Sequence, residues 1–408
     1  MILHDLIEAI QSTGPERNVR IGEAARWYCG LPQIFFRKHP RGKGNKKRTA
    51  DPIHVRLDHY LAGRYAALLN WWASDCERVA RTRKPQKPST PENRLKRGTE
   101  LICQGDVSKG TAAVEGLGTG PPNQATKTQM RGKHPQRPMS FGPSPNRGDG
   151  ADPPDLTKCK RILEQARVNV GVGPRGLRPG HLLPLIKGAL EDADATEAWG
   201  RLLTLGSLYV DDSMPPWLRR TLNAGLLTPL VKKAAAEGET PDSRPTNARN
   251  MDVSMWTKGI QRAHAPTVAA ELQPQQLGVN IPDGVQIKVL GLKLKIEEAL
   301  RYVSAFMVAC LDLKNAHNEY NRRAAQLEWE RLKEDHPYEP AWTDLASAHH
   351  ADCAHPSQIF MRSDTAACGL EMLREGTAGG PQGSAITILT FPILINRILK
   401  EVEAKFEG

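Results

Sequence analysis

The stretch from Tyr302 to Arg322, YVSAFMVACLDLKNAHNEYNR, constrains the fold of this 408-residue chain more than any other feature. An apolar run, partly β-branched and aromatic, ends at Asp312 and passes directly into a polar segment typical of a helix start. This pattern predicts a buried central strand with Asp312 at its tip. A carboxylate buried there is costly unless a cation or metal neutralises it, which favours a functional role. The alternative is a carboxylate that caps the following helix.

Three blocks around this stretch appear in a characteristic order. Residues 226–233 read LLTPLVKK, Arg244-Pro245 follows a polar loop, and residues 374–391 read REGTAGGPQGSAITILTF, a glycine-rich turn before an apolar helix or strand. Together with DLKNAHN at 312–318, these blocks resemble the reverse transcriptases of non-LTR retrotransposons. The corresponding family motifs read roughly L-P-K-K, R-P-I, D-[FL]-K-N-A-F-N and Q-Q-G-D-P-L-G-P.

Other segments extend the resemblance to about residues 155–400. They are GPRGLRPGHLL at 173–183, PPWLRRTLNAGLLTPL at 215–230, QQLGVNIPDG at 275–284 and QIFMRSD at 358–364. Each block alone is weakly specific, whereas their shared order is strongly specific. The segment at 215–230 is expected to form a helix and then a strand, and QIFMRSD the strand before the glycine turn.

The resemblance implies an α+β fold, with right-hand polymerase fingers and a partial palm over residues 155–408. A mainly helical, loop-rich N-terminal region is expected to precede it. We divide this region into a helical part with a basic loop (1–83) and a Pro/Gly-rich linker region (84–154), in which 84–92 and 116–154 are predicted to be irregular. Residues 94–135 loosely resemble the helical segment before the polymerase domain in some of these elements.

Polymerase chemistry explains which residue types the resemblance assigns to the site. Two metal ions hold the attacking and leaving oxygens during nucleotidyl transfer, and Mg²⁺ prefers oxygen ligands. Asp312 matches the first catalytic carboxylate, and the backbone carbonyl of Leu313 would join it at the metal. Lys232, Lys233 and Arg244 match the cations that reach the triphosphate. An ordinary basic surface remains the alternative for these three.

The glycine turn and His317 complete the implied nucleotide site. Gln382 and Gly383 match the turn that approaches the template and the incoming base, a proximity that glycine permits. His317 stands where the family carries an aromatic residue that excludes a ribose 2′ hydroxyl. Because histidine is smaller and polar, it is either a sugar gate or a partly buried histidine without that role. Ser384 and Ala385 replace the family's Asp-Pro, and Pro381 replaces a glutamine, which weakens the expectation of full activity.

The family's second carboxylate pair lies in a Y-x-D-D hairpin after the glycine turn, and no residue after Phe391 supplies it. We therefore expect a truncated site that is inactive alone. Residues 209–212 spell YVDD, but they precede Asp312, and their flanks match the family's fingers helix. We interpret them as a helix C-terminus with two solvated aspartates, and keep a permuted palm as the alternative.

Composition agrees with a nucleic-acid partner. The formal charge is +11 with a pI near 9.3, and residues 35–48, FFRKHPRGKGNKKR, contain seven lysines or arginines. This loop fits an arm on a phosphate backbone, a nuclear targeting signal or a solvated linker. The expected partners are an RNA template, a DNA primer and dNTP, with Mg²⁺ as cofactor and no membrane. The apolar run at 385–395 is too short to cross a bilayer.

The remaining patterns bear on compartment and on alternative functions. Seven cysteines without a C-x-x-C pair and no secretory leader favour the nucleus or cytoplasm over secretion. A cluster of possible zinc ligands has the spacing of no common finger; its members are His349, His350, Asp352, Cys353 and His355. Three interpretations compete: a reverse transcriptase segment, a non-catalytic RNA- or DNA-binding remnant, and a fragment that does not fold stably.

Overall fold

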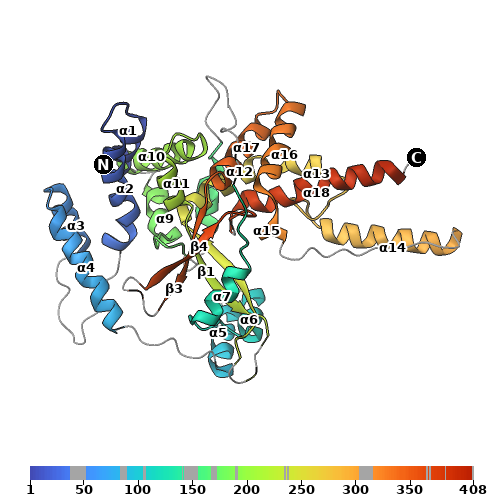
Figure 1. Cartoon of the computed structure of the whole chain (residues 1–408), viewed down its shortest axis with the longest axis horizontal. Helices are drawn as coiled ribbons and strands as arrows, with labels where there is room; N and C mark the ends of the chain where they lie inside the picture. Colours follow the sequence, from blue (N-terminus) through green and yellow to red (C-terminus); the bar gives the residue numbers. More distant parts are fainter. Residues whose placement is uncertain are drawn as a thin grey trace.

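The computed structural model describes most of the chain. The described residues are 1–36, 52–82, 90–103, 107–139, 141, 155–166, 172–188, 192–233, 236, 239–302, 316–363, 366, 369–381 and 383–406. Helices surround a small four-stranded sheet, so the fold is mixed α/β (Figure 1). None of the helices within these ranges is long and apolar enough to span a lipid bilayer.

The sheet has the strand order β2-β1-β3-β4. Its strands are β1 (Gly225–Val231), β2 (Ser243–Arg249), β3 (Ser357–Arg362) and β4 (Leu370–Gly376). Strands β1 and β2 form an antiparallel hairpin, β1 and β3 are parallel, and β3 and β4 are antiparallel. The predicted helix-then-strand at 215–230 is confirmed as α11 (Pro216–Leu222) followed by β1, and QIFMRSD contributes β3.

The largest core lies among helices beside the sheet. Four N-terminal helices are α1 (Ile2–Gln11), α2 (Arg17–Ile34), α3 (Pro52–Leu61) and α4 (Tyr65–Thr82). The central helices are α8 (Lys158–Gln165), α9 (Pro179–Gly188), α10 (Ala193–Val210), α12 (Met251–Ala263) and α13 (Ala265–Leu272). The C-terminal helices are α15 (Ala316–Glu319), α16 (Arg322–Asp335), α17 (Pro340–Cys353) and α18 (Ala385–Phe406). Trp256 of α12 is fully buried against Tyr209 of α10, and Trp329 and Trp342 are fully buried where α16 packs on α17.

Three helices form in the region predicted to be a linker: α5 (Pro91–Cys103), α6 (Val107–Glu115) and α7 (Gln124–Gly132). The prediction of irregular structure at 116–154 is therefore wrong for α7. The side chain of Asn123 caps this helix by accepting from the Thr126 N–H at 2.9 Å. Met130 is fully buried with Leu227, Ile359, Met361 and Leu373 of the sheet, so tertiary packing stabilises a helix with little apolar periodicity.

A strand was predicted to begin at Tyr302, but the structure has a helix at this residue. Helix α14 (Gly284–Tyr302) ends there, and Tyr302 is 80% exposed. Asp312 and Leu313 lie outside the described residues, so their predicted roles stay predictions. The described chain resumes at α15, immediately after this stretch.

Candidate functional site

Among the described residues, one face of the sheet is covered by a helix and the other carries exposed side chains. Helix α7 packs against the face that carries Leu227, Ile359 and Leu373. Because side chains alternate along a strand, Leu230, Arg244 and Thr246 of the β1–β2 hairpin project from the opposite face. These three residues are exposed, and Met372 of β4 is 48% exposed. This open sheet face is the largest part of the candidate site.

The hairpin brings two of the predicted nucleotide-binding cations to the open sheet face. Arg244 lies opposite Leu230, and the Lys232 N–H donates to the Asp242 carbonyl at 2.8 Å, which continues the antiparallel pairing by one step. Lys232 and Arg244 therefore lie on one side of the hairpin, whereas Lys233 alternates to the other. All three side chains are exposed. Asp242 is bound by Lys133 Nζ at 2.6 Å, and this bond lowers the pKa of the carboxyl.

The glycine turn packs on the end of β2 nearest the core. Gly383 is exposed and has φ +84°, a left-handed conformation that favours glycine. A Cβ on Gly383 would lie 2.9 Å from the Asn247 carbonyl oxygen of β2. This conformation and contact explain why a glycine stands here, whereas the predicted approach to the template and the incoming base stays a prediction. Gln382 lies outside the described residues.

His317 lies beside the same turn. Its carbonyl accepts the Gly380 N–H at 3.0 Å, and the Tyr320 carbonyl accepts the Gly379 N–H at 2.9 Å. The exposed imidazole meets the ring of Phe391 on α18 edge-on, with 5.6 Å between ring centroids. The segment after Asp312 is thereby joined to the glycine turn and to the first half of α18.

Arg322 binds backbone carbonyls of the glycine turn, a role that the sequence patterns did not predict. Its guanidinium is buried and donates to the carbonyls of Gly379 at 2.6 Å and Gly376 at 2.9 Å. The same side chain donates to the carbonyls of Cys353 at 3.1 Å and His355 at 3.2 Å. One cation therefore ties the end of β4 and the turn to the end of α17.

A second buried cation, Arg249, fixes the other side of the turn. It forms a two-pronged ion pair with Asp352, at 3.0 and 2.7 Å, in which both side chains are almost fully buried. Ser384, which directly follows Gly383, also donates its hydroxyl to the Asp352 carboxylate. These residues are far apart along the chain, and no sequence pattern indicated that they would meet. Ser384, which stands where the resembling enzymes carry aspartate, thus donates a hydrogen bond to this ion pair.

The YVDD tetrapeptide forms a helix end, as interpreted. Helix α10 ends at Val210, Asp211 is its C-cap, and both aspartates are exposed. Asp212 adds an ion pair with the buried Arg219 that was not foreseen. Tyr209 is fully buried, and its hydroxyl donates to Asp352 at 2.8 Å. Burial, with the negative charge of Asp352, raises the pKa of Tyr209.

Two of the residues considered as zinc ligands, Asp352 and His349, are committed to other contacts. Asp352 is paired with Arg249, and the ring of the buried His349 lies 2.8 Å from Gln326 Oε1 through Nδ1. Burial lowers the pKa of His349 to about 3, so the imidazole is neutral at physiological pH. Among the described residues, no three histidine, cysteine or acidic side chains form a group that could hold a metal ion.

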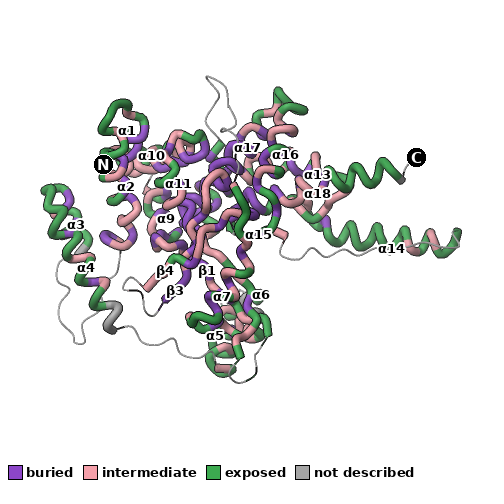
Figure 2. Tube along the Cα trace, in the orientation of Figure 1, coloured by how far each residue is buried: buried purple, intermediate pink, exposed green. Residues whose placement is uncertain are grey.

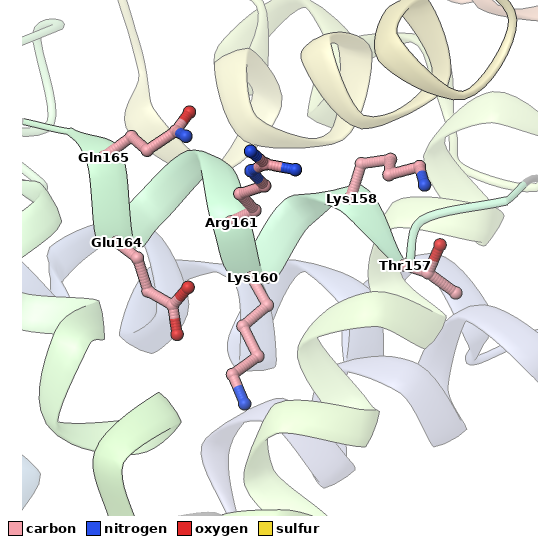
Figure 3. Close-up of a pocket in the computed structure, with 6 residues that line it drawn as sticks. All are labelled: Thr157, Lys158, Lys160, Arg161, Glu164 and Gln165. Atoms are coloured by element: carbon pink, nitrogen blue, oxygen red, sulfur yellow. The ribbon is translucent and has the colours of Figure 1, made fainter.

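A separate hollow lies over α8, away from these residues. It has a volume of about 500 Å³ and is lined by Thr157, Lys158, Lys160, Arg161, Glu164 and Gln165. Lys158 and Arg161 point to one side of the helix, whereas Lys160 and Glu164 point to the other (Figure 3). Because these side chains diverge, the hollow has no convergent set of polar groups and we assign it no function.

In comparison with known proteins, the sequence matches no protein-family model and no curated protein.

Proposed function

We propose that this chain is a fingers and partial-palm segment of an RNA-directed DNA polymerase from a non-LTR retrotransposon. In this proposal the open sheet face and the glycine turn hold a primer–template and the incoming dNTP. The observation that carries the proposal is the convergence of three resembling segments. The β1–β2 hairpin, the residues after Asp312 and the glycine turn are far apart in sequence, yet Gly383 packs on Asn247 and Gly380 bonds to His317.

The charges and accessibility of this surface support nucleic-acid binding. Lys232 and Arg244 are exposed on the open sheet face, and Gly383 and His317 are exposed at the glycine turn, which packs on the end of β2. Arg244 and Asn247 are three residues apart on the extended strand β2, so about 10 Å separates their Cα atoms. Backbone phosphates spaced along a strand of nucleic acid could contact both regions, and each contact would release counterions.

The proposal assigns Mg²⁺ to Asp312 and the Leu313 carbonyl, both outside the described residues. When bound, the metal would stabilise the attacking and leaving oxygens of nucleotidyl transfer. The carboxylate of Asp352, which Ser384 of the turn contacts, is paired with Arg249, and the described residues contain no group of three histidine, cysteine or acidic side chains that could hold a metal ion. The described residues therefore do not by themselves fit a two-metal site. We therefore derive no metal-dependent step, and assign to the described residues only the binding and positioning of nucleic acid and nucleotide.

A non-catalytic RNA- or DNA-binding remnant is the second candidate. Ser384 favours it, because the position where the resembling enzymes carry aspartate here holds a hydroxyl committed to the buried Asp352. The two candidates share the binding surface and differ only in chemistry. They are separated by primer extension with Mg²⁺ and dNTP: a product that disappears in Asp312→Ala supports the polymerase, and binding without extension supports the remnant.

Binding itself is tested with a labelled RNA–DNA primer–template at several salt concentrations. We expect the double variant Lys232→Ala/Arg244→Ala to bind more weakly and to lower the slope of log affinity against log salt by about two, one for each lost phosphate contact. The matched control is Arg20→Ala/Lys187→Ala, which removes two exposed cations on α2 and α9. Equal losses in both double variants would contradict a specific role for the hairpin.

A further inference from the structure

Helix α14 is an exposed apolar helix that leaves the body of the molecule. It extends outward on the same side of the view as the outer half of α18 (Figure 1), and its surface is exposed along nearly its whole length (Figure 2). Val285 and Val289 are 62% and 63% exposed, and Leu292 is 45% exposed. Apolar side chains gathered in this way on one projecting helix indicate an interaction surface.

The apolar residues of α14 include a regular seam. Val285, Val289, Leu292, Ile296 and Ala299 follow one another at spacings of four, three, four and three residues. This is the spacing of a coiled coil, in which apolar residues alternate between the a and d positions of a seven-residue repeat. Val289 and Ile296 fall at a and Leu292 at d, the β-branched and leucine preferences of a two-stranded pairing. We call these five residues the α14 seam.

Lysines flank the α14 seam on both sides. Lys288 and Lys295 occupy the g positions, and Lys293 occupies an e position, so the positions that face a partner helix carry positive charge. All three are exposed. Lys288 Nζ donates to the Gln275 carbonyl at 3.2 Å, and Lys293 lies 4.0 Å from Glu297 on its own helix. The glutamates of α14, Glu297 and Glu298, lie at b and c, away from the seam.

This charge pattern selects among possible occupants. Pairing with a second copy of α14 would place lysine against lysine in either orientation, which is unfavourable. A membrane-surface helix is expected to have one broad apolar face rich in Trp and Phe, whereas α14 also exposes Ile287, Leu290 and Leu294 on its opposite face. We propose that the α14 seam binds an amphipathic helix of another protein whose seam is flanked by glutamate or aspartate. This surface is separate from the proposed nucleic-acid site.

The proposal is tested with two synthetic helical peptides of about three heptads that share an Ile/Leu seam and differ only at e and g. One carries glutamate at these positions and the other carries lysine. We expect the full chain to bind the glutamate peptide at least about tenfold more tightly than the lysine peptide, with a preference that weakens as salt rises. Fluorescence anisotropy of labelled peptides measures both affinities.

Variants of α14 locate the binding and its charge dependence. Leu292→Asp interrupts the seam and should abolish binding, whereas Leu294→Asp makes the same change on the opposite face and should leave binding intact. Lys288→Glu/Lys293→Glu/Lys295→Glu should reverse the preference toward the lysine peptide. The proposal is overturned if neither peptide binds, if both bind equally, or if Leu294→Asp is as harmful as Leu292→Asp. Self-association through α14, or α14-dependent binding to phosphatidylserine vesicles without peptide binding, would also overturn it.

Discussion

Asp352 joins four segments of the chain through one side chain and one carbonyl. Its carboxylate accepts from Arg249 of β2, Tyr209 of α10 and Ser384 of the glycine turn, and its carbonyl accepts from Asn223 at 2.7 Å. The charge is buried but paired, and the remaining lone pairs are occupied by hydroxyl donors. A buried ion pair of this kind is costly to break, because removing one partner leaves the other charge unpaired in a low-dielectric interior.

We expect Asp352→Asn to lower the free energy of unfolding by about 3–5 kcal/mol, because Arg249 would keep its charge without a counterion. Asp335→Asn is the matched control, since it removes a carboxylate from an exposed pair with Arg331 and should change stability by no more than about 1 kcal/mol. Urea unfolding followed by circular dichroism measures both. A loss of similar size in the two variants would show that Asp352 is not the buried anchor described above.

Single residues were the least predictable part of the site. Asp352 was grouped by sequence with four possible zinc ligands, and Ser384 was noted only as a departure from a family motif. Neither pattern could indicate Arg249, because that contact depends on how α17, β2 and the turn come together. Arg322 is similar, since its partners are backbone carbonyls, which carry no residue-specific signal. The spacing of apolar residues indicates which face of a helix or strand is buried. It does not indicate which polar residues, distant in sequence, will pair.

At the scale of elements, local patterns predicted what local physics determines. The glycine turn was expected from its turn residues and the α11–β1 unit from the family resemblance, and both form. Helix α7 was missed because its stabilisation comes from burial of Met130 against the sheet and from contacts with β4. Asp312 and Leu313 lie outside the described residues, so the central catalytic assignment stays a prediction.

The glycine turn gives a prediction at this scale. Gly383→Ala should lower the free energy of unfolding by about 2 kcal/mol, because alanine is strained at positive φ and its Cβ would press on the Asn247 carbonyl. Gly200→Ala is the control: this glycine is inside α10 with open space around it, so alanine should be neutral or stabilise by up to about 1 kcal/mol. Thermal unfolding of the two variants distinguishes them. Equal melting temperatures would contradict the close approach of the turn to β2.

At the scale of the whole molecule, the segment from Gly118 to the end of α7 and the sheet form one packed unit. Residues 118–120 extend the sheet, since the Gly120 N–H donates to the Pro229 carbonyl at 2.8 Å and the Val231 N–H to the Gly118 carbonyl at 3.0 Å. Lys127 pairs with Glu371 of β4 at 2.5 Å. These contacts place α7 on the sheet face that carries Leu227. Arg244 is exposed on the opposite face. The segment from Gly118 to the end of α7 thus determines which sheet face is accessible.

Arg374 connects the end of α7 to β4, and its removal tests this arrangement. Its guanidinium donates to the carbonyls of Arg131 at 2.5 Å and His134 at 2.6 Å, and the Arg131 side chain donates back to the Leu373 carbonyl at 3.1 Å. Arg374→Ala should therefore accelerate amide hydrogen exchange over residues 124–134 by about tenfold or more, since charged hydrogen bonds contribute about 1.5–3 kcal/mol. Exchange in α10 should not change, and Arg362→Ala, at the exposed end of β3, should leave both regions unaffected. Unchanged exchange in α7 would mean that the helix folds and docks independently of β4, and the covered sheet face would then need another explanation.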